Sequence, residues 1–144
     1  DRIGADHGVA VQAFDARYVV GRAHLARAVE LADRAFDRGE NVADDRAVEI
    51  LLYAAGRRQI NRALELGVDT GGCPAVLVAH GTGDEAAATA ALRSLDAVTP
   101  AETLGASDPE RVREWFDVGE AELATGVDLP AVVRERVALL VVEK

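Results

Sequence analysis

Apolar residues recur every three or four positions through much of the first third of the chain, which is the spacing of a helix with one buried face. Between Gly21 and Phe36, charged residues occupy the opposite side, and Gly39 follows. The segment from Asp44 to Ala55 begins with two acidic residues suited to a helix start and is then apolar on nearly every side. The pattern therefore predicts an amphipathic helix ending at Gly39 and a central, buried helix interrupted by Gly56.

Start and stop signals predict further helices along the rest of the chain. Arg57 to Leu66 resumes a helical pattern until Gly67. Three later starts carry capping residues and early prolines: Asp84-Glu85 before an alanine-rich stretch, Ser107-Asp108-Pro109-Glu110 in the form of a capping box, and Asp128 with Pro130 before a short helix.

Strands are expected to be few and far apart. After a polar leader, VAVQAF (9–14) alternates like a strand, and the continuous apolar run AVLVAH (75–80) is typical of a strand covered on both faces. A short edge strand is expected around Leu95 to Val98, and VALLVV (137–142) reads as a fully apolar final strand. We predict one α+β domain, residues 1–144, with a small three- to four-stranded sheet packed with several helices.

Composition limits the class of protein. The chain has 144 residues, 49% of them hydrophobic, and a net charge of −9, while fifteen of its sixteen cations are arginine. Such a surface fits adaptation to high salt or a GC-rich genome, and it argues against general binding to nucleic acid. No apolar run is long enough to span a membrane. One cysteine, Cys73, fits a reducing compartment, so we expect a soluble cytoplasmic protein.

Candidate catalytic and ligand sites are weak. HGTGDE (80–85) lies between a strand and a helix like a phosphate-binding turn, but its spacing matches no known fingerprint and its acids would repel phosphate. Cys73 has no histidine that the sequence places beside it, and the acidic residues form no spaced metal site. The sequence therefore predicts no catalytic residue, no metal and no cofactor.

The arginines are unevenly distributed along the chain. Residues 17–62 carry a net charge of +2, whereas residues 63–144 carry −9. Arg57, Arg58, Gln59 and Arg62 follow the Gly56 break, where a helix N-terminus would favour phosphate. The alternative is a surface helix whose arginines balance nearby acids such as Glu65.

Two blocks of the sequence resemble a known family. They are E-I-L-x-x-x-[AS]-G-x-x-Q-I, from Glu49 to Ile60, and D-A-x-x-V-x-G-x-x-H, from Asp15 to His24. Together with the AVLVAH run, the ERVREWF segment and the apolar tail, they are similar to the small Cgi-type subunit of the archaeal and eukaryotic KEOPS complex, called PRPK-binding protein in animals. The acidic composition suggests an archaeal, halophilic member.

The resemblance implies a function. In that family the subunit is not an enzyme; it binds the kinase/ATPase subunit of KEOPS and recruits tRNA by its single-stranded CCA 3′ end for threonylcarbamoyladenosine (t6A) modification. The chemistry of single-stranded RNA ends places the RNA contacts at Arg57, Arg58, Gln59 and Arg62, extended to Arg22 and His24. From composition alone, His24 is more readily explained as a buried, hydrogen-bonded residue. Lysines of other members are replaced or lost here, so bulk attraction to RNA should be weak.

Alternative functions remain open at this stage. The protein could be a small enzyme that uses the HGTGDE turn with His80, or a scaffold that binds protein only. Exposed apolar positions on the helices are the expected kinase-docking surface.

Overall fold

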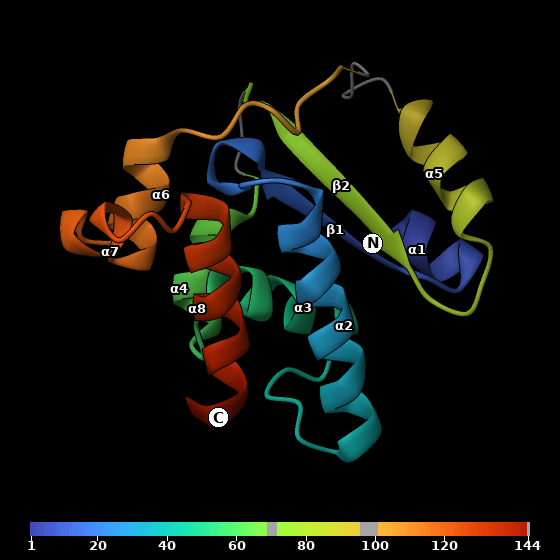
Figure 1. Ribbon diagram of the computed structural model, residues 1–144. Coiled ribbons are helices and arrows are strands. Elements are labelled where there is room, and N and C mark those ends of the chain that lie inside the picture. Colours follow the sequence, from blue (N-terminus) through green and yellow to red (C-terminus); the bar gives the residue numbers. More distant parts are fainter. Residues whose placement is uncertain (69–71, 96–100, 144) are drawn as a thin grey trace.

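The α+β class is confirmed, but the sheet is smaller than predicted. The computed structural model describes residues 1–68, 72–95 and 101–143 (Figure 1). Within these residues the sheet has two antiparallel strands, β1 (Ala10–Asp15) and β2 (Ala75–His80), not three or four. The helices are α1 (Arg2–His7), η1 (Ala16–Tyr18), α2 (Arg22–Arg38), α3 (Arg46–Ala55), α4 (Ile60–Ala63), η2 (Leu64–Leu66), α5 (Glu85–Arg93), α6 (Pro109–Phe116), α7 (Glu120–Ala124) and α8 (Leu129–Glu143).

Helices α2 and α3 form as the sequence pattern predicted. The Asp45 carboxylate caps α3 by accepting a hydrogen bond from the Ala47 amide at 2.8 Å. Gly39 and Gly56 end the two helices in the left-handed conformation, with φ of 67° and 64°. All residues from Ile50 to Ala55 are buried, so α3 is the central helix of the core, between α2, α8 and strand β1.

Strand β2 is more exposed than its apolar sequence predicted. In the sheet, Ala10 pairs with His80 and Asp15 pairs with Ala75. Because the sheet has two strands, each is an edge strand, and the Leu77 side chain of β2 remains 37% exposed. The β1 strand is better covered, with Phe14 fully buried. The prediction that AVLVAH is covered on both faces was therefore wrong.

The predicted C-terminal strand at residues 137–142 is instead the second half of helix α8. The Asp128 carboxylate accepts a hydrogen bond from the Ala131 amide at 2.9 Å and so caps this helix. Its buried residues, Val132, Val133, Val137 and Leu140, lie at helical spacing along the side that packs against α2 and α3. An apolar run of six residues has no period of its own, so it was consistent with either structure.

Three other predictions at element ends need correction. Residues 2–7, predicted as a polar leader, form α1, which packs against α5 beyond the end of the sheet (Figure 1). Asp108, not Ser107, caps α6, since its carboxylate accepts hydrogen bonds from the amides of Glu110 and Arg111. The helix predicted from residue 57 begins only at Ile60 and continues as the 3-10 turn η2.

The described residues leave out one predicted strand and include no helix suited to a membrane. The edge strand predicted around Leu95 to Val98 falls almost entirely outside them. Among the helices of the described residues, none combines the length and apolarity needed to cross a membrane.

Candidate functional site

A cleft of about 740 Å³ lies where η1, the α4–η2 segment and α6 meet. Its lining residues come from three separate parts of the chain and include three arginines, two aromatic residues and four acidic residues. In Figure 1, α4 and α6 lie on the same side of the molecule, away from the α1–α5 end of the sheet. The cleft therefore lies beside the helical core rather than on the sheet.

The floor of the cleft is a pair of aromatic rings, Tyr18 and Trp115. The rings meet edge to face, with centroids 5.9 Å apart and planes at 74°. The indole Nε1 of Trp115 donates a hydrogen bond to the carbonyl oxygen of Ala55 at 2.9 Å, which ties α6 to the end of α3. Tyr18 and Trp115 are only 6% and 7% exposed, so neither ring is open for direct stacking by a ligand.

Three arginines cover these rings. The guanidinium carbons of Arg57 and Arg62 lie 4.7 and 5.9 Å from the centroid of the Trp115 ring, and that of Arg111 lies 5.6 Å from the Tyr18 ring. Each is within range of a cation–π interaction, worth about 0.5–1 kcal/mol at an exposed site. The two rings are therefore covered by guanidinium groups.

Acidic residues line the same cleft and outnumber the arginines. They are Glu65 of η2, Asp108 at the α6 cap, and Glu110 and Glu114 of α6, against Arg57, Arg62 and Arg111. Burial, together with its hydrogen bond to Glu65, raises the pKa of the Tyr18 hydroxyl, which donates to Oε2 of Glu65 at 3.1 Å. The cleft is therefore mixed in charge and slightly acidic, which differs from the purely basic site that the arginine run suggested.

Of the four residues that the sequence grouped after Gly56, the structure places Arg57 and Arg62 at the cleft. Arg58 and Gln59 are exposed between them in the chain but are not among the lining residues. Residues 57–59 are not helical, because Gly56 ends α3 and Gln59 only precedes α4. The expected phosphate site at a helix N-terminus is therefore not present, since α4 spans only four residues.

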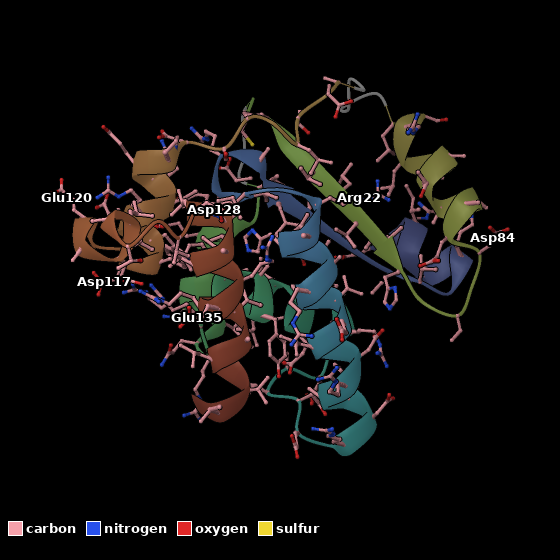
Figure 2. The ribbon with its side chains drawn as sticks, in the orientation of Figure 1. Arg22, Asp84, Asp117, Glu120, Asp128 and Glu135 are labelled. Carbon is pink, nitrogen blue, oxygen red and sulfur yellow. The ribbon has the colours of Figure 1, made fainter. Side chains whose placement is uncertain are left out.

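His24 and Arg22 lie apart from the cleft. His24 is 1% exposed, with Nε2 2.8 Å from the carbonyl oxygen of Ala54 and Nδ1 accepting a hydrogen bond from the Val20 amide at 3.3 Å. Burial lowers the pKa of this imidazole. Arg22 is the first residue of α2 (Figure 2) and does not line the cleft. His24 therefore joins α2 to α3 inside the core, and a ligand cannot reach it without rearrangement.

Sequence reasoning missed Tyr18, Trp115 and Arg111 as parts of the site. Trp115 is buried in its helix, yet it also lies under two arginines. One signal was available: aromatic residues make up only 4% of the chain, and Trp115 is its single tryptophan. Rare aromatic residues are worth testing as ligand platforms even when they fit a helical core pattern.

The HGTGDE turn is built for packing. The amides of Gly83 and Asp84 donate to the carbonyl oxygens of Gly8 and His7, at 3.2 and 3.0 Å. A Cβ at Gly83 would lie 2.0 Å from the His7 carbonyl oxygen, so this glycine permits a close approach of two backbones. The amides of Gly83 and Asp84 are thus already bonded to the backbone of residues 7 and 8 and are not available to a phosphate.

His80, the histidine of this turn, belongs to an ion cluster. Its Nε2 lies 2.5 Å from Oδ2 of Asp33, whose other oxygen bonds Arg46, and its Nδ1 lies 3.4 Å from Glu85. These contacts join β2 and α5 to α2 and α3. Within the described part of the chain, no three His, Cys, Asp or Glu residues form a group able to hold a metal ion.

Comparison with known proteins identifies the family. No curated protein sequence gives a significant match to the chain. The family model described as kinase binding protein CGI-121 matches residues 4–140, which include all the residues that line the cleft. Because this match covers nearly the entire sequence, the chain belongs to the CGI-121 family of kinase-binding proteins.

Proposed function

We propose that this kinase-binding protein is a non-catalytic accessory subunit of the KEOPS complex, which makes t6A in tRNA. In this role it supports the kinase/ATPase subunit and holds the single-stranded CCA 3′ end of tRNA in the cleft between η1, α4–η2 and α6. The observation that carries the RNA part is the placement of Arg57 and Arg62 over the Trp115 ring. The proposed place of action is the cytoplasm of a salt-adapted archaeon.

The cleft has the groups that single-stranded RNA requires. Unpaired bases stack on aromatic rings or on the planes of arginine guanidinium groups. Here the rings lie beneath the arginines, so the bases would stack on guanidinium planes that the rings hold in place. Arg58 and Gln59, which follow Arg57 in the chain, are exposed and carry donors for phosphates and base edges.

A charge-reversal experiment tests the RNA site. Arg57→Glu combined with Arg58→Glu, and separately Arg62→Glu, should weaken binding of a fluorescent tRNA by about tenfold or more, because each loses phosphate attraction and a stacking plane. Arg38→Glu is the matched control, since Arg38 is exposed at the far end of α2. Affinity for tRNA equal to wild type in both cleft variants, with the fold intact by circular dichroism, would refute this site.

The kinase partner is proposed to dock on the C-terminal end of α8. Leu139, Val141 and Val142 are 42%, 40% and 83% exposed, which is unusual for neighbouring apolar residues at one helix end. Helix α8 starts beside α6 and runs away from it, so its C-terminal end lies far from the α6 side of the cleft (Figure 1). A kinase bound there leaves the cleft open, as an adaptor for two partners requires.

An assay of t6A formation separates this proposal from a scaffold that binds protein only. A pure scaffold would restore t6A formation in a reconstituted complex even when Arg57, Arg58 and Arg62 are all neutralised. An adaptor that holds tRNA would lose activity with the same variant while it still binds the kinase.

A further inference from the structure

The side chain of His80, the last residue of β2, lies between two carboxylates that come from different helices. Its Nε2 is 2.5 Å from Oδ2 of Asp33 on α2, and its Nδ1 is 3.4 Å from Oε2 of Glu85, the first residue of α5. The other oxygen of Asp33 bonds Arg46, the first residue of α3, at 2.5 Å. We call these four residues the His80 cluster. The cluster connects α5, through β2, to α2 and α3.

Both contacts of the His80 ring are attractive only when both of its nitrogens carry protons. A neutral imidazole has one N–H donor and one nitrogen with a lone pair, whereas an imidazolium has two donors. Without the second proton, one of the two carboxylates faces a lone pair and loses its donor. The protonated cluster therefore pairs two cations with two anions, while the deprotonated cluster leaves Arg46 as the one cation for Asp33 and Glu85.

The other neighbours of His80 add no competing charge. On β1, the residue that pairs with His80 is Ala10. In the turn after β2, the Gly81 amide donates a hydrogen bond to Oε2 of Glu85 at 3.2 Å, which helps to hold this carboxylate near the ring. The side chains of His80 and Asp33 are 31% and 34% exposed, so the ring can exchange its proton with water while the protein stays folded.

Helix α5 has few other contacts that hold it to the molecule. It packs against α1 and β2, on the opposite side of the molecule from α6 and α7 (Figure 1). Of its nine residues, Ala88 and Leu92 alone are buried. Segments with few buried apolar contacts open locally at a lower free energy than the core. We therefore expect α5 to open more readily than α3, whose residues 50–55 are all buried.

We propose that protonation of His80 holds α5 against the rest of the molecule, and that loss of this proton lets α5 open while the helical core stays folded. Above about pH 6, histidine is the side-chain type of this cluster that changes its charge. The contribution of the cluster is complete at the acidic end of that range and is lost as pH rises. This inference does not rest on the proposed RNA site.

Native-state hydrogen exchange on the full chain tests the inference. Exchange of the α5 amides is followed by mass spectrometry from about pH 6 to about pH 9, at one fixed salt concentration, and each rate is divided by the intrinsic rate at that pH. The opening equilibrium of α5 should increase with pH, by at most about tenfold per pH unit for one proton. The amides of α3 should show no such increase.

Three variants test whether His80 causes the effect. His80→Gln removes the charge, so α5 should open at acidic pH as readily as it does in wild type at alkaline pH. His80→Arg keeps a cation at every pH and should keep α5 closed at alkaline pH. His7→Gln is the matched control, because His7 lies on the adjacent helix α1 and is bonded to the Ile3 carbonyl oxygen. This control should keep the pH dependence of wild type.

Several results would overturn the inference. They are an opening of α5 in wild type that does not change with pH, a pH dependence that persists in His80→Gln, and an α3 that opens in parallel with α5. Opening of α5 at alkaline pH in a folded His80→Arg protein would also overturn it. If His80→Arg does not fold, Asp33→Asn with Glu85→Gln takes its place. Loss of the pH dependence in that double variant supports the inference, and its persistence overturns it.

Discussion

Arg57 holds Trp115 by two contacts at once: its guanidinium carbon lies 4.7 Å from the ring centroid, and its Nη2 donates to the Trp115 carbonyl oxygen at 2.5 Å. The first contact covers the ring and the second fixes the backbone of α6. Together they join the loop after α3 to α6, since Trp115 follows Arg57 by 58 positions in the sequence. The cleft therefore depends on a tertiary contact rather than on a local motif.

Replacement of Trp115 tests this contact. Trp115→Ala should lower the free energy of unfolding by about 3–5 kcal/mol, because it leaves a cavity under the arginines. Trp115→Phe keeps a ring but loses the hydrogen bond to the Ala55 carbonyl oxygen, and should cost about 1–3 kcal/mol. Urea denaturation measures both. Tyr18→Phe, which removes only the hydroxyl bound to Glu65, is the control and should cost less than either.

Glu49 should be essential for stability although it lies outside the cleft. It is fully buried, and its Oε1 accepts hydrogen bonds from the amides of Val42 and Ala43 at 3.1 and 3.0 Å. Glu49→Gln replaces one acceptor oxygen by a donor and should lower the free energy of unfolding by about 1–3 kcal/mol. Glu30→Gln, which removes an exposed carboxylate paired with Arg27 and Arg34, should cost less than about 1 kcal/mol. Equal losses in the two variants would contradict this assignment.

The burial of His24 should make the stability of the protein depend on pH. Burial lowers the pKa of its imidazole below the ordinary value of 6.5, so between the two values the unfolded chain binds more protons than the folded one. Neutral His24 therefore contributes fully to the free energy of unfolding above the ordinary pKa. This contribution is lost as pH falls below that value, and the free energy of unfolding changes by at most about 1.4 kcal/mol per pH unit. Denaturation curves between pH 5 and 8 measure this slope.

A matched pair of histidine variants tests whether His24 causes this pH dependence of stability. His24→Gln should flatten the dependence relative to wild type. His7→Gln changes a histidine that is bonded to the Ile3 carbonyl oxygen on α1, remote from the core, and should leave the slope as it was. Identical slopes in wild type and His24→Gln would show that another group controls the transition.

The proposed kinase-docking surface gives a test that is independent of RNA. Leu139→Asp with Val142→Asp places two charges on the exposed apolar end of α8 and should weaken binding to the purified kinase partner by about tenfold or more. Val127→Asp is the control, since Val127 is similarly exposed, at 43%, but precedes α8. Titration calorimetry gives the affinities. Unchanged kinase binding in the double variant, together with unchanged tRNA binding, would move the docking site elsewhere.

Local pattern was enough to predict the central helices. The periodic apolar residues of α2 and α3, the Asp45 cap and the final glycines Gly39 and Gly56 act within a few residues of each other, and all of them are found in the structure. The same holds for the caps of α5 and α8, at Asp84 and Asp128.

Predictions failed where tertiary packing decides the outcome. The run at 137–142 has no period that distinguishes strand from helix, and its packing against α2 and α3 settles it as helix. Because this segment is a helix, the sheet of the described residues has fewer strands than predicted. Only part of the cleft could be found from the sequence. Arg57 and Arg62 are close to each other in the chain, but their aromatic partner, Trp115, comes from α6, which no short motif connects to them.

Gly56 shows how backbone conformation alone can restrict a position to glycine. At φ 64° it turns the chain between α3 and the arginines, and a Cβ there would lie 3.6 Å from the Arg136 carbonyl oxygen and 3.7 Å from the Phe116 ring. Space alone would admit a methyl group; the backbone geometry is what disfavours it. The arginines that follow can therefore change without altering this turn, whereas a residue with a Cβ at position 56 would have to adopt a conformation that glycine alone adopts at no cost.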